Sequence, residues 1–172
     1  MSINGETPRA FSAPERAATV ISRIGGALSA LLILVVLAIT AVSVFNRYFL
    51  GRPLMGVDEA TGFLVVAIVM FGAAEALRRG DHIRIDLLFD LLGSRARWWL
   101  ELWSLASVLV FAALLLVASW HTVVFSYRFG AYSTGYLSLP MWIPQSTMVA
   151  GAVLLGLAAL AAMLRLFGER RP

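Results

Sequence analysis

Four long apolar runs dominate the pattern of hydrophobic and polar positions along this chain. They cover residues 24–45, 60–77, 102–120 and 146–164, and a charge interrupts only the second, at Glu75 near its end. As a helix, the first run reaches roughly 33 Å, against about 30 Å for the hydrocarbon core of a bilayer. The runs are continuously apolar, which argues against the alternating strands of a membrane barrel. The pattern therefore predicts an all-α integral membrane protein with four transmembrane helices.

The composition agrees with this and limits the chemistry that the chain can perform. Hydrophobic residues make up 60% of the 172 positions and charged residues only 14%, unlike a soluble domain. The sequence contains no Cys, which excludes disulfides, thiolate metal sites and a cysteine nucleophile. It also lacks a Gly-rich phosphate loop and a nucleophile beside a base, so we expect no enzyme, no cofactor and no metal site.

The distribution of charge predicts the topology. All 14 basic residues are Arg, and in a soluble protein the net charge of +4 would suggest nucleic acid. Here the Arg residues lie between apolar runs, so we expect them to hold membrane loops in the cytoplasm. We expect no nucleic-acid partner. Eleven fall on one side of the membrane, and only Arg47, Arg52 and Arg128 fall on the other. The positive-inside rule then places both termini in the cytoplasm. We expect three parts along the chain: a mobile tail (residues 1–21), a four-helix membrane domain (22–167) and a second, C-terminal tail (168–172).

The connection between the second and third runs contains a segment with helical periodicity at residues 85–93. Its apolar residues share one face, while Asp86 and a second Asp lie on another. Deep burial would cost about 2.5–3.5 kcal/mol for each charged residue. We expect a short amphipathic helix in the membrane interface. The alternative is a helical turn that continues into the third span.

Glu75 is the only acid well inside an apolar run. An acid within the membrane suggests a proton or cation site. However, Arg78 and Arg79 follow at spacings of three and four residues, which brings all three side chains to one helix face. The spacing therefore favours an ion pair near the membrane interface over transport chemistry.

Asp58 and Glu59 stand side by side at the start of the second run. Adjacent acids can bind a metal or perform acid–base chemistry. They also suit a helix N-terminus, where a negative charge is favoured by about 0.3–1 kcal/mol. Arg47 and Arg52 are close in sequence, so we expect capping and ion pairing, within this chain or with a partner.

The histidines and the loop before the fourth run complete the candidates. A haem site needs two His at similar depth, whereas His82 and His121 fall on opposite sides of the predicted membrane. Pro140 and Pro144 should prevent a regular helix between them, and Trp142 suits the membrane interface. This loop is either a turn with a membrane anchor or a docking surface outside the membrane.

Several motifs together resemble the small membrane subunit (DctQ-like small permease) of TRAP transporters, the tripartite ATP-independent periplasmic systems. They are Asn46-Arg47-Tyr48, Asp58-Glu59, Phe71-Gly72-Ala73-Ala74, Arg78-Arg79-Gly80-Asp81-His82-Ile83, Ile85-Asp86-Leu87-Leu88 and Leu139-Pro140-Met141-Trp142-Ile143-Pro144. The resemblance runs from the first apolar run to the fourth and implies a multi-pass protein of the bacterial inner membrane.

The resemblance also implies a role and partners. Such a subunit is similar to a scaffold: it stabilises a large permease that carries the substrate and sodium ions, and it uses no ATP. An extracytoplasmic solute receptor delivers an organic acid and docks partly on the small subunit, and membrane lipid surrounds the complex. The resemblance also implies structural and assembly roles for two sets of residues in this chain. Arg47, Asp58 and Glu59 fix the outer ends of the first two helices, and Arg78, Arg79, His82 and Asp86 organise the interfacial helix.

Two other functions stay open. A self-sufficient four-helix transporter would place its coupling chemistry at Glu75. A membrane anchor of a respiratory enzyme would require the two histidines to bind haem.

Overall fold

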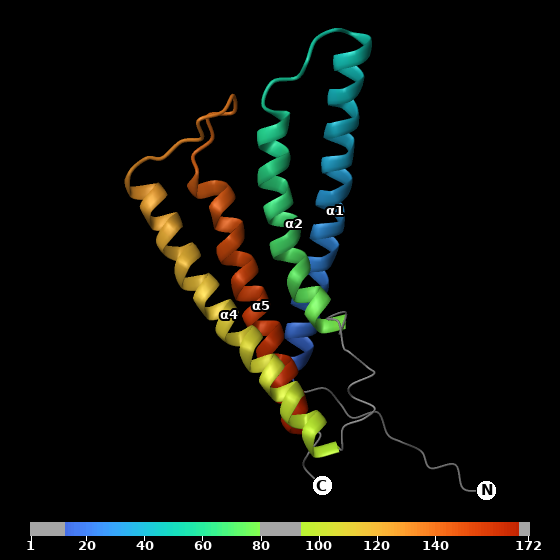
Figure 1. Ribbon diagram of the computed structural model, residues 1–172, viewed down its shortest axis with the longest axis vertical. Helices are drawn as coiled ribbons and strands as arrows, with labels where there is room; N and C mark the ends of the chain where they lie inside the picture. Colours follow the sequence, from blue (N-terminus) through green and yellow to red (C-terminus); the bar gives the residue numbers. More distant parts are fainter. Residues whose placement is uncertain (1–12, 80–93, 169–172) are drawn as a thin grey trace, which may run out of the picture.

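The computed structural model describes residues 13–79 and 94–168, and these residues form four α-helices (Figure 1). The helices are α1 (Ala13–Phe49), α2 (Val57–Arg79), α4 (Ser94–Arg128) and α5 (Trp142–Gly168). All four are long and apolar enough to cross a membrane. This confirms the all-α fold with four membrane-spanning helices. The predicted helix at residues 85–93, with His82 and Asp86, lies outside the described residues.

The four helices form two antiparallel pairs that meet along α2 and α5. α2 packs against α1 and α5, whereas α4 packs mainly against α5. Figure 1 shows the pairs close together at one end and separated at the other. We call the separated end, which carries the α1–α2 and α4–α5 connections, the loop end, and the opposite end the terminal end. The buried apolar residues lie mostly on α2 and α5 and are mostly alanine; they include Ala67, Ala74, Ala152, Ala158 and Ala159.

Small residues let the backbones of α1, α2 and α5 approach closely. The Ser29 hydroxyl of α1 donates a hydrogen bond to the Ile68 carbonyl of α2, at 2.9 Å. A Cβ added at Gly25 would lie 3.0 Å from the Phe71 carbonyl oxygen, and one added at Gly151 would lie 2.7 Å from that of Met70. Close contacts of this kind, with hydrogen bonds between helices, are how membrane helices associate without a hydrophobic driving force.

The packing face of α1 repeats at alternating steps of three and four residues. From Ser22 to Asn46, the buried or half-buried positions that follow this repeat are Ser22, Gly25, Ser29, Leu32, Val36, Ile39, Ser43 and Asn46, and Gly26 lies beside them. On α4, the buried residues Ala112, Ser119 and Ser126 recur every seven positions, and Ala112 lies beside Gly156 of α5. Both patterns are typical of long, nearly parallel helix pairs.

The helices extend beyond the predicted spans. α1 begins at Ala13, so residues 13–21 are helical and precede the predicted span 24–45. Pro14 fits its first turn, where a missing N–H costs nothing, and Ala, Glu and Arg there favour helix. α4 likewise continues past both ends of the predicted run 102–120. The apolar runs marked the hydrocarbon core, but the backbone hydrogen bonding of a helix does not stop at the membrane surface.

The expectation that Pro140 and Pro144 exclude a helix between them is wrong. α5 begins at Trp142, so Pro144 lies within its first turn. The first backbone N–H groups of a helix have no partner inside it, and proline is therefore tolerated there. The residue before the helix supplies an acceptor for this first turn: Gln145 N donates to the Met141 carbonyl at 3.2 Å.

Candidate functional site

Two polar clusters lie at opposite ends of α2. The first, the C-terminal cluster of α2, consists of Glu75, Arg78 and Arg79. Glu75 is 7% exposed, and its Oε2 accepts a hydrogen bond from Arg78 Nε at 2.6 Å. Its Oε1 accepts hydrogen bonds from Arg78 Nη2 at 2.6 Å and from Arg79 Nε at 2.8 Å. The ion pairing expected from the spacing is therefore present with both arginines.

Glycine on the neighbouring helix makes room for the buried acid. A Cβ added at Gly26 of α1 would lie 2.7 Å from Cγ of Glu75. The stem of Glu75 thus packs directly against the α1 backbone, and its carboxylate is neutralised from the α2 side. Burial of an unpaired carboxylate would be strongly unfavourable, so the two guanidinium groups make this packing possible.

The two arginines do not play equal parts in this cluster. Arg78 engages both oxygens of Glu75 in a bidentate pair, and its side chain is 23% exposed. Arg79 uses Nε alone for Glu75, and its side chain is 63% exposed. Arg78 therefore holds the acid through both of its oxygens, whereas Arg79 adds one bond and stays largely exposed.

The second cluster, the N-terminal cluster of α2, joins Glu59 to the α4–α5 loop. Glu59 Oε1 accepts a hydrogen bond from the Ser133 hydroxyl, and Oε2 accepts one from the Leu137 backbone N–H at 3.1 Å. Gly135 lies against the same carboxylate, and a Cβ at this position would overlap it. Gly56, at φ +82°, lets the start of α2 turn beneath the Leu137 side chain. The loop between α4 and α5 is thereby fastened to α2 across the loop end.

The same loop is stiffened internally. Ser133 N donates to the Leu139 carbonyl at 2.8 Å, and Met141 N donates to the Ala131 carbonyl at 2.9 Å. These bonds flank a single antiparallel bridge between Tyr132 and Pro140. Pro140 therefore helps to shape the loop.

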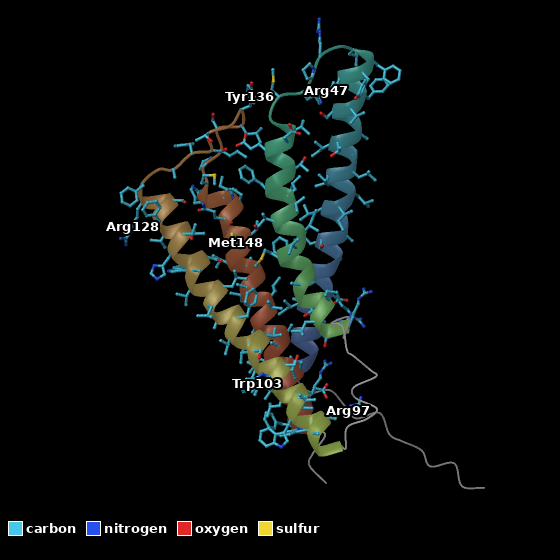
Figure 2. The ribbon with its side chains drawn as sticks, viewed as in Figure 1. Arg47, Arg97, Trp103, Arg128, Tyr136 and Met148 are labelled. Atoms are coloured by element: carbon cyan, nitrogen blue, oxygen red, sulfur yellow. The ribbon has the colours of Figure 1, made fainter. Side chains whose placement is uncertain are left out.

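Aromatic side chains mark both ends of the bundle. Trp142 packs edge-on against Tyr127, with ring centroids 6.0 Å apart, and Tyr136 is 74% exposed. Figure 2 shows Tyr136 at the loop end and Trp103 near the terminal end. Near Trp103, Trp98 packs against Phe167 at 5.8 Å. Two aromatic belts at the membrane surfaces are consistent with this arrangement.

The acid–arginine pairing expected at the loop end is not formed within the described residues. No ion pair there joins Asp58 or Glu59 to Arg47 or Arg52, and Asp58 is exposed. Glu59 binds the distant loop instead, a partner that sequence reasoning missed. The sequence contained only a weak indication of this contact: a hydroxyl donor at Ser133 and a glycine at Gly135, next to the loop that contains the two prolines.

Asn46 has a local role at the end of α1. Its side-chain Nδ2 donates to the Val42 carbonyl at 3.0 Å, and its own carbonyl accepts from Leu50 N and Arg52 N, each at 3.2 Å. Asn46 thus closes the last turn of α1 and starts the connection to α2. Arg47 lies beside it at the loop end (Figure 2).

The surface beside the N-terminal cluster of α2 is an open depression of about 620 Å³. Its lining includes Asp58, Phe63, Tyr132 and Thr134. Within residues 13–79 and 94–168, no group of three His, Asp or Glu side chains could hold a metal ion. The depression therefore lies at the junction between the start of α2 and the α4–α5 loop.

The sequence is similar to known transporter subunits. A family model described as "Tripartite ATP-independent periplasmic transporters, DctQ component" matches residues 36–169. The C4-dicarboxylate TRAP transporter small permease protein DctQ of Vibrio cholerae serotype O1 is 31% identical over 83 residues, which cover 48% of this chain and 36% of that protein. The ectoine TRAP transporter small permease protein TeaB of Halomonas elongata is 27% identical over 139 residues, 77% of this chain and 71% of that protein.

No solved structure matches the chain. The family match covers most of the chain, including the loop end, α2 and the full length of α4 and α5. It agrees with the four membrane-spanning helices and with the motifs at both ends of α2. The chain therefore belongs to the DctQ family, the small permease components of the tripartite ATP-independent periplasmic (TRAP) transporters.

Proposed function

We propose that this chain is a non-catalytic scaffold subunit of a TRAP uptake system in the bacterial inner membrane. In this proposal it stabilises a large permease that moves an organic acid together with sodium ions. An extracytoplasmic solute receptor docks partly on its loop end. The subunit itself binds no substrate and uses no ATP.

The observation that carries the proposal is the uncovered apolar surface of α1. Only 6% of its most apolar stretch is buried, against 28% for α5. Leu31, Leu34, Leu37 and Phe45 each expose more than half of their surface. Lipid alone can cover such a face, but a helix that packs along one narrow edge also offers a large area to a partner helix.

The state of Glu75 supports a scaffold over a self-sufficient transporter. Both of its oxygens are bound by arginine, so the acid is held as an ion pair on one helix. A coupling site needs a group that can exchange its proton or ion during transport. The close contacts at Gly25, Gly26 and Gly151 also favour a rigid bundle over one that opens and closes.

The loop end is the proposed outer face. The positive-inside rule places the two termini in the cytoplasm, and the loop end then faces the receptor. Tyr48, Phe49, Tyr132 and Tyr136 are all largely exposed there. Exposed aromatic residues at the end of α1 and on the loop that Glu59 holds suit contact with another protein.

The chain does not identify the transported solute. One relative is named for C4-dicarboxylate and the other for ectoine, so small subunits of one family serve different solutes. We infer that selection is made by the receptor and the large permease.

The test is affinity purification of the chain from native membranes in mild detergent, followed by mass spectrometry and reconstitution. The proposal expects a stoichiometric large permease, and solute uptake in liposomes only when permease, receptor and a sodium gradient are all present. Uptake by this chain alone would contradict it and would make Glu75 the leading candidate for the coupling site.

A further inference from the structure

We propose that the terminal end of α2 carries a binding site for the headgroup phosphate of an anionic phospholipid, with Arg79 as its main ligand. This inference goes beyond the scaffold role. It rests only on the placement of the four helices in a membrane.

The first step is the inventory of donors around Glu75. A guanidinium has five N–H donors, and Arg79 spends only its Nε–H on the acid. Arg78 binds both oxygens of the same carboxylate, with two bonds of 2.6 Å. Among residues 13–79 and 94–168, the Nη groups of Arg79 have no hydrogen-bond partner, and the side chain as a whole is 63% exposed.

The second step is the charge of the cluster. One carboxylate faces two guanidinium groups, so the C-terminal cluster of α2 keeps one net positive charge. Arg23 adds a further exposed guanidinium on α1. It stands one turn, about 4.5 Å along the axis, before Gly26, which packs on Glu75. Both α1 and α2 therefore carry exposed cations near their contact at this end.

The third step is the depth of the cluster in the membrane. Arg79 is the last residue of α2, a membrane-spanning helix that ends toward the terminal end of the bundle (Figure 1). Trp103 lies near the same end (Figure 2). Next to Arg23, Val20 is 54% exposed and Ile24 is 62% exposed. An anion that binds here must therefore accept hydrogen bonds while its neighbours contact apolar side chains. An anionic phospholipid supplies both, with a phosphate that matches the guanidinium fork and acyl chains for the apolar surface.

The test uses the full-length protein, purified in detergent and stripped of lipid. Native mass spectrometry measures how much dioleoyl-phosphatidylglycerol or dioleoyl-phosphatidylcholine stays bound after equal addition. The wild type should retain phosphatidylglycerol about fivefold better than phosphatidylcholine, the factor expected for one basic residue at an anionic surface. Arg79→Gln should remove most of this preference, because it removes the cation that binds the headgroup. The Arg78–Glu75 pair does not involve Arg79, so the packing of α2 should be kept. The matched control is Arg128→Gln, an exposed arginine at the loop end (Figure 2).

Two results would overturn the proposal. Equal retention of the two lipids by the wild type, or an unchanged preference in Arg79→Gln, would show that the cluster has only a structural role. Addition of inorganic phosphate distinguishes a lipid from a free anion. Retention of phosphatidylglycerol against millimolar inorganic phosphate supports the lipid site, whereas complete displacement would contradict it. Arg79→Lys, which keeps the charge but loses the planar fork, should keep part of the preference.

Discussion

Glu59 and Leu137, 78 residues apart, are joined by a hydrogen bond of 3.1 Å from the Leu137 backbone N–H to the Glu59 carboxylate. This bond connects α2 to the α4–α5 loop at the end where the two helix pairs separate (Figure 1). Together with the Ser133 hydroxyl bond to the same side chain, it is a polar connection between the two pairs at the loop end.

Removal of the Glu59 carboxylate should release the α4–α5 loop. Glu59→Ala deletes both acceptors, and hydrogen bonds to a charged group contribute about 1.5–3 kcal/mol. We expect faster proteolytic cleavage near Tyr136 in detergent, with little change in helix content by circular dichroism. Glu59→Gln is the control, because its amide can still bind both the Ser133 hydroxyl and the Leu137 N–H. Equal cleavage of Glu59→Ala and the wild type would show that the loop is held by other contacts.

Arg78 and Arg79 should differ in their effect on stability. Arg78→Gln breaks the bidentate pair and leaves Oε2 of Glu75 buried without its partner, which should destabilise the protein by about 1–3 kcal/mol. Arg79→Gln removes one bond from an acid that stays paired, and it should cost less. The measurement is the thermal unfolding midpoint in the same detergent. If Arg79→Gln were the more damaging substitution, the bidentate pair would not be what keeps Glu75 buried.

Local relationships were predictable from the sequence. The ion pair of Glu75 follows from spacings of three and four residues on a helix, and each membrane span follows from an apolar run long enough for the bilayer. The ends of the helices were not predictable in the same way. A segment with charged residues, such as 13–21, can continue a helix outside the hydrocarbon core, where no continuous apolar run reveals it.

Relationships between distant segments were missed. The bonds of Glu59 cross 74 and 78 positions of the chain, and only the packing of α2 against α5 brings the loop within reach. Sequence neighbours of Glu59 suggested Arg47 and Arg52 instead, although the Asn46 cap directs that end of α1 into a separate turn. Pro144 was expected to prevent a helix, but its effect depends on where the helix begins. In the first turn of α5 a proline is tolerated.

The close approach of α2 and α5 gives a direct test of packing. In Gly151→Ala the new Cβ would stand 2.7 Å from the Met70 carbonyl oxygen, so the helices must separate, at about 1–3 kcal/mol. Gly62→Ala is the matched control, since nothing lies within 4 Å of a Cβ there and alanine favours helix by up to about 1 kcal/mol. The thermal midpoint should fall in the first variant and stay level or rise in the second. A level midpoint in Gly151→Ala would mean that α2 and α5 can move apart freely, against a rigid scaffold.

The absence of native cysteine makes the proposed orientation measurable. In spheroplasts, a membrane-impermeant maleimide should label Tyr136→Cys at once, because the loop end faces outward in the proposed topology. Gly168→Cys, exposed at the end of α5, should be labelled only after the membrane is permeabilised. The physical reason is that the predicted topology assigns 11 of the 14 arginines to the side of Gly168, and basic loops are retained in the cytoplasm. The reverse pattern would place the loop held by Glu59 in the cytoplasm, out of reach of any extracytoplasmic receptor, and receptor docking on this subunit would then be impossible there.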